Sequence, residues 1–194
     1  MEVIDLVRAA VNAMVSHNII HPEMRPQYEY AIEIIVERFI TLASMLLISI
    51  CLGKVIHSIF FLSFFMLLRR YTGGYHAGNF YFCYIESMLI FILIMIFGDK
   101  ILSNQILSYV SFVSSFALIM LVGTINHPNM NYSEPELRES KKSARYMLLL
   151  ETFIIVSLWT LEASEQYICF MSWGIILCAL SVVVAKITKQ EVVR

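Results

Sequence analysis

The chain has 194 residues, of which 59% are hydrophobic and 15% are charged, and its formal net charge is −1 at pH 7. Soluble domains usually carry about 25% charged residues, so this composition argues against a soluble enzyme and predicts an integral membrane protein. The small net charge does not by itself indicate a function. No nucleic acid is expected as a partner.

The first 26 residues form a predicted amphipathic segment. Apolar side chains recur at helical spacing from Val3 to Val15, and Asp5 and Arg8 lie on the opposite face. This pattern is typical of a helix that lies in the headgroup plane of a bilayer. A helix that packs on the protein's own cytosolic face fits the same pattern, so the sequence leaves both placements open.

Six apolar stretches follow and predict an all-α polytopic membrane protein with about six transmembrane helices. They are 39–53 with the turn before it, 55–68, 79–98, 102–125, 146–161 and 166–185. A helix needs about 20 apolar residues to cross a bilayer. The second stretch approaches that length only if Lys54 and Arg69 snorkel at its ends. Residues 126–145 are predicted to be a long polar connection.

The whole chain is expected to form a single membrane-embedded domain. Its parts are an amphipathic cytoplasmic-face helix at 1–26, transmembrane helices at 27–185 and a cytoplasmic tail at 186–194. This division treats the amino-terminal helix as an attachment to the membrane core and not as a separate domain.

The positions of the basic residues predict the orientation of the chain. With six spans, one side carries the amino-terminal segment, the 69–70 pair, the 138–145 cluster and the tail, whereas Lys54 and Lys100 lie on the other side. Short loops rich in Lys and Arg favour the cytoplasm. Both termini and the segment RRYTGGYHAGNFYFC, which begins at Arg69, are therefore predicted to be cytoplasmic. One long helix over 39–68 would leave five spans and scatter this asymmetry.

The polar segment 69–87, RRYTGGYHAGNFYFCYIES, carries the residues with reactive chemistry. A cysteine such as Cys83 is a useful nucleophile when it is ionised, and a neighbouring imidazole such as His76 can take its proton. Seven residues of straight helix would separate the two by about 10.5 Å along the axis. A dyad therefore requires a loop, made possible by the glycines, that folds back over the first turn of the helix carrying Cys83.

Other interpretations of this pair stay open. His76 and Cys83 can each be packing or interfacial residues. A zinc site normally needs three or four protein ligands, and Glu86 is a poor addition to the pair, so no metal or other cofactor is expected. The remaining cysteines lie in apolar stretches, where a free thiol behaves as a small hydrophobe, and no disulfide framework is expected among Cys51, Cys169 and Cys178.

The segment RRYTGGYHAGNFYFCYIES closely resembles the motif of the AgrB (accessory gene regulator protein B) family, bacterial membrane endopeptidases that process a quorum-sensing propeptide. The resemblance extends to the length, the amphipathic start, the multi-span layout and the basic segment after residues 127–129. It implies that Cys83 is the nucleophile and His76 its general base. The same resemblance assigns supporting or substrate-binding roles to Arg69, Arg70, Gly74 and Glu86.

The resemblance also implies a reaction and a location. Cleavage of an AgrD-like propeptide would proceed through an acyl-enzyme thioester and lead to a thiolactone or lactone ring, at the bacterial cell membrane. The expected partners are this propeptide and the lipid bilayer, with a homodimer as a further possibility. The competing interpretation is a small polytopic transporter or a non-catalytic membrane partner, and the thiol of Cys83 discriminates between the two.

Overall fold

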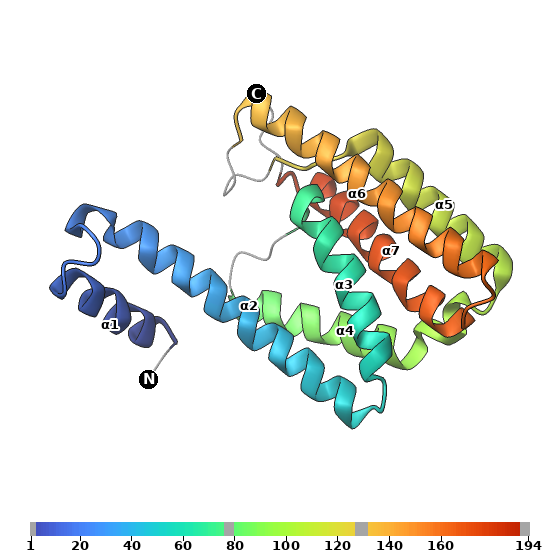
Figure 1. The fold of residues 1–194 in the computed structure, drawn as a ribbon, viewed down its shortest axis with the longest axis horizontal. Coiled ribbons are helices and arrows are strands. Elements are labelled where there is room, and N and C mark those ends of the chain that lie inside the picture. The colour runs from blue at the N-terminus through green and yellow to red at the C-terminus, as the bar shows by residue number, and fades with distance from the viewer. Residues whose placement is uncertain (1–2, 76–79, 127–131, 191–194) are drawn as a thin grey trace. The chain divides into compact units, whose positions relative to one another are not determined.

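The computed structural model describes residues 3–75, 80–126 and 132–190. All secondary-structure elements within these ranges are helices (Figure 1). Six of the helices are long and apolar enough to cross a bilayer. The predicted class, an all-α polytopic membrane protein, is therefore confirmed. The chain divides into two compact units, Met1–Leu47 and Ile48–Arg194.

The first unit contains helix α1 (Val3–Ser16), the short 3-10 helix η1 (Pro22–Met24) and most of α2 (Arg25–Cys51). Val7 and Val11 of α1 are buried, and their cluster includes three residues of α2, namely Tyr28, Ile32 and Val36. The apolar spacing thus predicted the helix correctly. The apolar face of α1 therefore packs against α2, and its placement relative to the bilayer stays a prediction.

The second unit is a bundle built around its last helix. Its helices are α3 (Val55–Thr72), α4 (Phe80–Leu102), α5 (Gln105–Val122), α6 (Glu134–Thr160) and α7 (Glu165–Ile187). Helix α7 contacts each of the other four, and it lies among α3, α5 and α6 in Figure 1. Ile175 and Cys178 of α7 are fully buried in the main apolar cluster. Helix α7 therefore occupies the core of the second unit.

A glycine sets the close approach of α3 and α7. A Cβ atom added at Gly174 would lie 2.8 Å from the backbone nitrogen of Phe65 and 2.8 Å from Cβ of Phe64. Because backbone atoms cannot move aside easily, any side chain at this position would push the two helices apart. The carboxyl end of α3, which carries Arg69, is thereby held against α7.

Helix α6 corrects one predicted boundary. It begins at Glu134 and not at residue 146, so most of the predicted polar connection 126–145 is helical. The carboxylate of Glu136 accepts hydrogen bonds from the backbone N–H of Ser133 at 2.8 Å and from its hydroxyl at 2.6 Å. Such a Ser–x–x–Glu pair is a helix-start signal. The basic cluster 138–145 therefore lies on a helix.

The turn between α4 and α5 corrects a second boundary. Asp99 and Lys100 were predicted to follow the end of a span, but α4 continues through them to Leu102. The next helix starts at Gln105 because the side chain of Asn104 accepts hydrogen bonds from two backbone N–H groups of its first turn. An Asn side chain at this position satisfies amides that would otherwise lack partners.

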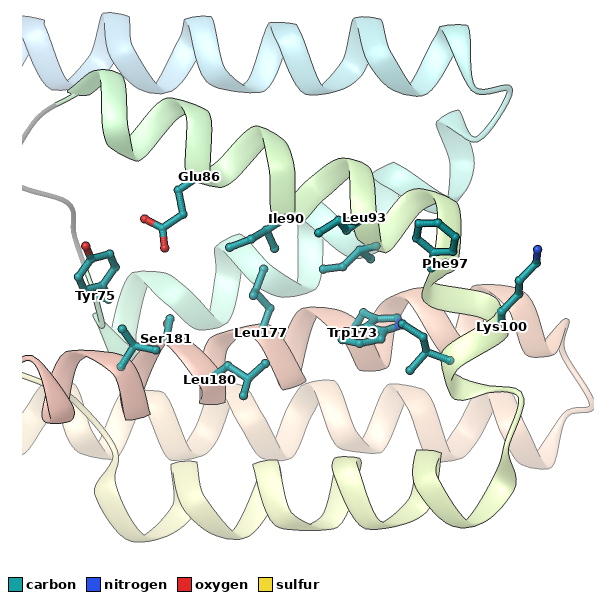
Figure 2. A pocket seen from close by; sticks show the side chains of 13 residues that line it. Tyr75, Glu86, Ile90, Leu93, Phe97, Lys100, Trp173, Leu177, Leu180 and Ser181 are labelled. Atoms are coloured by element: carbon teal, nitrogen blue, oxygen red, sulfur yellow. The ribbon is translucent and has the colours of Figure 1, made fainter.

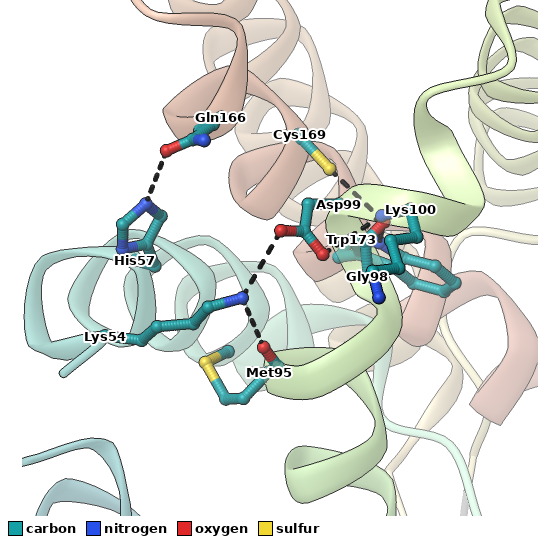
Figure 3. A network of polar contacts seen from close by, with 9 residues as sticks. All are labelled: Lys54, His57, Met95, Gly98, Asp99, Lys100, Gln166, Cys169 and Trp173. Carbon is teal, nitrogen blue, oxygen red and sulfur yellow. Dashed lines mark hydrogen bonds and ion pairs between the residues drawn. The ribbon is translucent and has the colours of Figure 1, made fainter. Parts of the chain in front are cut away.

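A polar network joins the start of α3 to α4 and α7 (Figure 3). Lys54 Nζ donates to the carbonyl of Met95 at 2.6 Å and lies 3.4 Å from Asp99 Oδ2. His57 Nε2 lies 3.3 Å from Gln166 Oε1. These contacts fix the end of the second unit that is remote from Arg69, since the two lie at opposite ends of α3.

Glu151 is buried in the middle of the second unit. Its side chain lies on α6 with a relative exposure of 2%, and among the described residues neither carboxylate oxygen has a hydrogen-bond partner. A polar group in an apolar interior is costly when it lacks a partner.

Replacing Glu151 by leucine is expected to stabilise the fold by about 1–3 kcal/mol, because it removes an unpartnered polar group of similar volume. For a chain of this size, that corresponds to a rise of several degrees in the unfolding midpoint, at about 2–4 °C per kcal/mol. The measurement is thermal unfolding of the purified protein in detergent. Exposed Glu139 lies on the same helix, and Glu139→Leu should leave the midpoint nearly unchanged. A lower midpoint for Glu151→Leu would contradict the argument.

Candidate functional site

The side chain of Arg69 holds the loop that follows α3. Its Nη1 donates to the carbonyl of Gly73 at 2.6 Å and also to the hydroxyl of Ser181 on α7. Its Nη2 donates to the carbonyl of Tyr75 at 2.5 Å. The planar guanidinium offers several donors in a fixed fork, so one side chain fixes both ends of a three-residue loop and connects it to a second helix.

Backbone and hydroxyl contacts fasten the same loop to its neighbours. The N–H of Tyr75 donates to the carbonyl of Ser181 at 3.0 Å. The N–H of Ile125, just after α5, donates to the carbonyl of Thr72 at 2.9 Å, and the hydroxyl of Thr124 donates to the carbonyl of Tyr71 at 2.8 Å. The end of α3 is thereby joined to α7 and to the end of α5.

Both glycines of the loop have a physical reason to be glycine. Gly73 has φ of 63° and Gly74 has φ of 127°, values that side chains rarely allow. A Cβ at Gly74 would overlap the guanidinium of Arg69 and lie 2.6 Å from the hydroxyl of Ser181. A Cβ at Gly73 would lie 3.0 Å from the carbonyl oxygen of Ile125. The hydrogen bonds from Arg69 to Gly73, Ser181 and Tyr75 are called the Arg69 fork below. They can form only if position 74 lacks a side chain.

Cys83 is the fourth residue of α4, and its side chain is half-buried. Residues 73–75 are not helical, so α3 and α4 do not form one continuous helix through the segment. His76 directly follows the fixed Tyr75 but lies outside the described residues, and its distance to Cys83 stays a prediction.

Two further predicted site residues differ in their placement. Glu86 lies one turn after Cys83 on α4, and its side chain lines a pocket with Tyr75 and Ser181 (Figure 2). Arg70 is exposed, and its guanidinium carbon lies 5.8 Å from the centre of the Tyr71 ring. The structure therefore groups Arg69 and Gly74 around the loop and places Glu86 beside it, whereas Arg70 takes no part in the fork.

The sequence reasoning missed Ser181. It accepts a hydrogen bond from Arg69 and donates one to the carbonyl of Cys178 at 2.9 Å. The available signal was weak, since a lone serine within a transmembrane stretch is common. All four cysteines are free thiols. In the three described ranges, no group of three or more His, Cys, Asp or Glu residues is arranged to hold a metal ion.

Known proteins share extended similarity with this chain. The family described as Accessory gene regulator B matches residues 7–182. An Accessory gene regulator protein B of Staphylococcus aureus strain MRSA252 is 28% identical over 129 residues, which cover 66% of this chain and 65% of that protein. The corresponding protein of strain MW2 is 29% identical over 128 residues with the same coverage.

A third relative matches over a longer stretch. The Accessory gene regulator protein B of Staphylococcus aureus bovine strain RF122 / ET3-1 is 26% identical over 165 residues, which cover 85% of this chain and 86% of that protein. The first two matches span 65% of the relatives' length, and no solved structure matches the chain to a significant degree. Because the family match extends over most of the sequence, the chain belongs to the Accessory gene regulator B family.

Proposed function

We propose that this protein is a membrane cysteine endopeptidase of the accessory gene regulator quorum-sensing system. It cleaves the carboxyl-terminal part from an AgrD-like propeptide, with Cys83 as the nucleophile and His76 as the general base, and promotes closure of a thiolactone or lactone ring. The observation that supports this best is the Arg69 fork, which holds the residue before His76 against α7, while Cys83 occupies the first turn of α4.

The proposed reaction has two steps. His76 takes the proton of Cys83, the thiolate attacks a backbone carbonyl carbon of the propeptide, and the imidazolium returns the proton to the departing amine as the C–N bond breaks. The product is a thioester between Cys83 and the amino-terminal fragment. A cysteine or serine within that fragment then attacks the thioester carbonyl, closes the ring and restores the Cys83 thiol. Arg69 is a positioning residue, because it acts through the loop that carries the base.

The energetics of this reaction favour a dry, semi-enclosed site. A thioester lacks the resonance stabilisation of an amide, so the first step is uphill, and water competes with the internal nucleophile at the second. Tyr75 and Glu86 lie at the mouth of a largely apolar pocket, which suits this requirement. Departure of the cleaved tail would draw the first step forward.

The proposed orientation follows the basic residues. The Arg69 fork, the start of α6 with its 138–145 cluster and the end of α7 lie at one end of the second unit. Lys54 and Asp99 form an ion pair at the other end. With six spans, the basic end belongs in the cytoplasm, so the proposed site opens to the cytoplasmic side of a bacterial cell membrane.

The test is to trap the proposed thioester. The purified protein is incubated in vesicles with a synthetic AgrD-like propeptide, whose ring-forming cysteine or serine has been changed to alanine. A covalent adduct with the mass of the amino-terminal fragment is expected on Cys83, and hydroxylamine should release it. The unchanged propeptide should leave little adduct. Cleavage of the altered propeptide without any adduct, or an adduct that survives in Cys83→Ala, would contradict the mechanism.

A further inference from the structure

A pocket of about 660 Å³ runs between α4 and α7. One end is polar, with Tyr75, Glu86 and Ser181 at its mouth, and Lys100 stands at the far end (Figure 2). The wall between these ends is apolar and includes Ile90, Leu93, Phe97, Trp173 and Leu177. The pocket thus runs along the two helices, from Tyr75 and Glu86 in the segment 69–87 toward Lys100 near the end of α4.

The pocket begins one helical turn from Cys83 along α4. On α4, Glu86 lies three residues and Ile90 seven residues after Cys83, and these spacings place all three on one face of the helix. Ile90 is therefore about 10.5 Å farther along the axis than the thiol. From the other side, Tyr75 lines the mouth and is followed directly by His76. A chain attached to Cys83 can extend into this pocket.

On the basis of the proposed function, we propose that this pocket binds bulky apolar side chains of the propeptide segment that precedes the cleaved bond. The segment on this side becomes the acyl group on Cys83 and has to stay bound after the tail departs. Apolar walls hold such side chains by removing them from water. They also keep water away from the thioester until the internal nucleophile attacks.

The mouth of the pocket favours a peptide over a lipid. Among the described residues, none bonds to the carboxylate of Glu86, which faces the space shared with Tyr75 and Ser181. A carboxylate accepts hydrogen bonds from backbone N–H groups, which a peptide presents along its length. The phosphate of an anionic phospholipid at the same place would be repelled by the like charge.

Filling the pocket provides the first test. Leu177 and Ile90 are half-buried in its wall, and Leu177→Trp, with Ile90→Trp as a second variant, would occupy the space with an indole. The kcat/KM for a propeptide with Leu or Phe before the cleaved bond should fall about tenfold to a hundredfold, the size of one buried side chain. Leu89 lies beside Ile90 on α4, is 57% exposed and does not line the pocket, so Leu89→Trp should change kcat/KM less than threefold.

The substrate side of this experiment separates a specific subsite from general damage. Changing the apolar residue before the cleaved bond to alanine should reduce cleavage by the wild-type protein, and Leu177→Trp should then cause little further loss, because the two changes remove the same contact. If the free-energy losses from Leu177→Trp and from the substrate change add, the pocket does not bind that substrate residue. The same conclusion follows if Leu177→Trp alters only the preference for residues after the cleaved bond. If the wild-type protein cleaves no propeptide, the proposed function itself fails. If cleavage is normal and both pocket variants behave like Leu89→Trp, the subsite alone fails.

A fluorescence measurement tests the lipid alternative. Trp173 lines the pocket, and the other tryptophan, Trp159, is 70% exposed, so Trp159→Phe leaves Trp173 as the single reporter. This variant, combined with Cys83→Ala, is placed in vesicles of phosphatidylglycerol with brominated acyl chains, which quench nearby indoles. Adding the propeptide should relieve the quenching as its apolar residues displace lipid. Quenching that persists at saturating propeptide would show that an acyl chain occupies the pocket and would overturn the proposal.

Discussion

Replacing Cys83 by alanine is expected to abolish propeptide cleavage, with a loss of more than about a thousandfold, because removal of a catalytic nucleophile leaves only binding and electrostatic effects. Cys83 is half-buried near the start of α4, and the change removes one sulfur atom, so the fold should persist. The measurement is conversion of the propeptide by mass spectrometry, in vesicles that contain equal amounts of each protein.

A matched thiol control is available in the same chain. Cys51 is exposed at the end of α2, and Cys51→Ala removes a thiol without touching the segment 69–87. This variant should cleave at the wild-type rate within about twofold. His76→Ala should resemble Cys83→Ala, although His76 lies outside the described residues. Continued cleavage by Cys83→Ala would exclude Cys83 as the nucleophile, whereas absence of cleavage by the wild-type protein would favour the transporter or partner interpretation.

Most of the helical layout was predictable because membrane spans are encoded by local composition. Apolar length alone identified the six stretches, whereas the roles that the motif assigns to Arg69, Gly74 and Cys83 stay predictions. The start of α6 was misplaced because its first turns are basic and resemble a solvated loop. The pair Ser133 and Glu136 was the local signal that outweighed this appearance.

The contacts of the site were less predictable because they join segments distant in sequence. Arg69 reaches Ser181, which lies 112 residues later, and no local pattern marks a serine in an apolar helix as the partner of an arginine. The apolar pocket was equally hard to predict, because the sequences of α4 and α7 each show only a continuous apolar run. Which residues face the pocket depends on how the two helices pack, and a hydropathy pattern does not specify that packing.

Replacing Arg69 by lysine is expected to lower kcat at least tenfold while KM changes little. Lysine keeps the positive charge but lacks the planar fork, so it cannot hold Gly73, Tyr75 and Ser181 together as Arg69 does. Hydrogen bonds from a charged donor contribute about 1.5–3 kcal/mol each, and tenfold corresponds to about 1.4 kcal/mol. Loss of a single bond from the fork therefore accounts for the lower bound.

The neighbouring arginine supplies the control for this change. Arg70 is exposed over the ring of Tyr71, so Arg70→Lys keeps the net charge and should alter kcat less than threefold. The rate of Cys83 alkylation by iodoacetamide at neutral pH provides a second readout, because a displaced base no longer takes the thiol proton. Arg69→Lys should slow alkylation toward the rate of His76→Ala. Equal kcat and alkylation rates for the two lysine variants would contradict the role of the fork.

Gly74→Ala tests the same fork from the loop side. The added Cβ would overlap the Arg69 guanidinium, and the backbone φ of 127° already disfavours a side chain, so kcat should fall at least tenfold here too. Because both changes disrupt one set of contacts, the double variant Arg69→Lys with Gly74→Ala should lose little more than either single variant. If kcat of the double variant falls by the product of the two single factors, Gly74 and Arg69 act independently. The glycine at position 74 would then need another explanation.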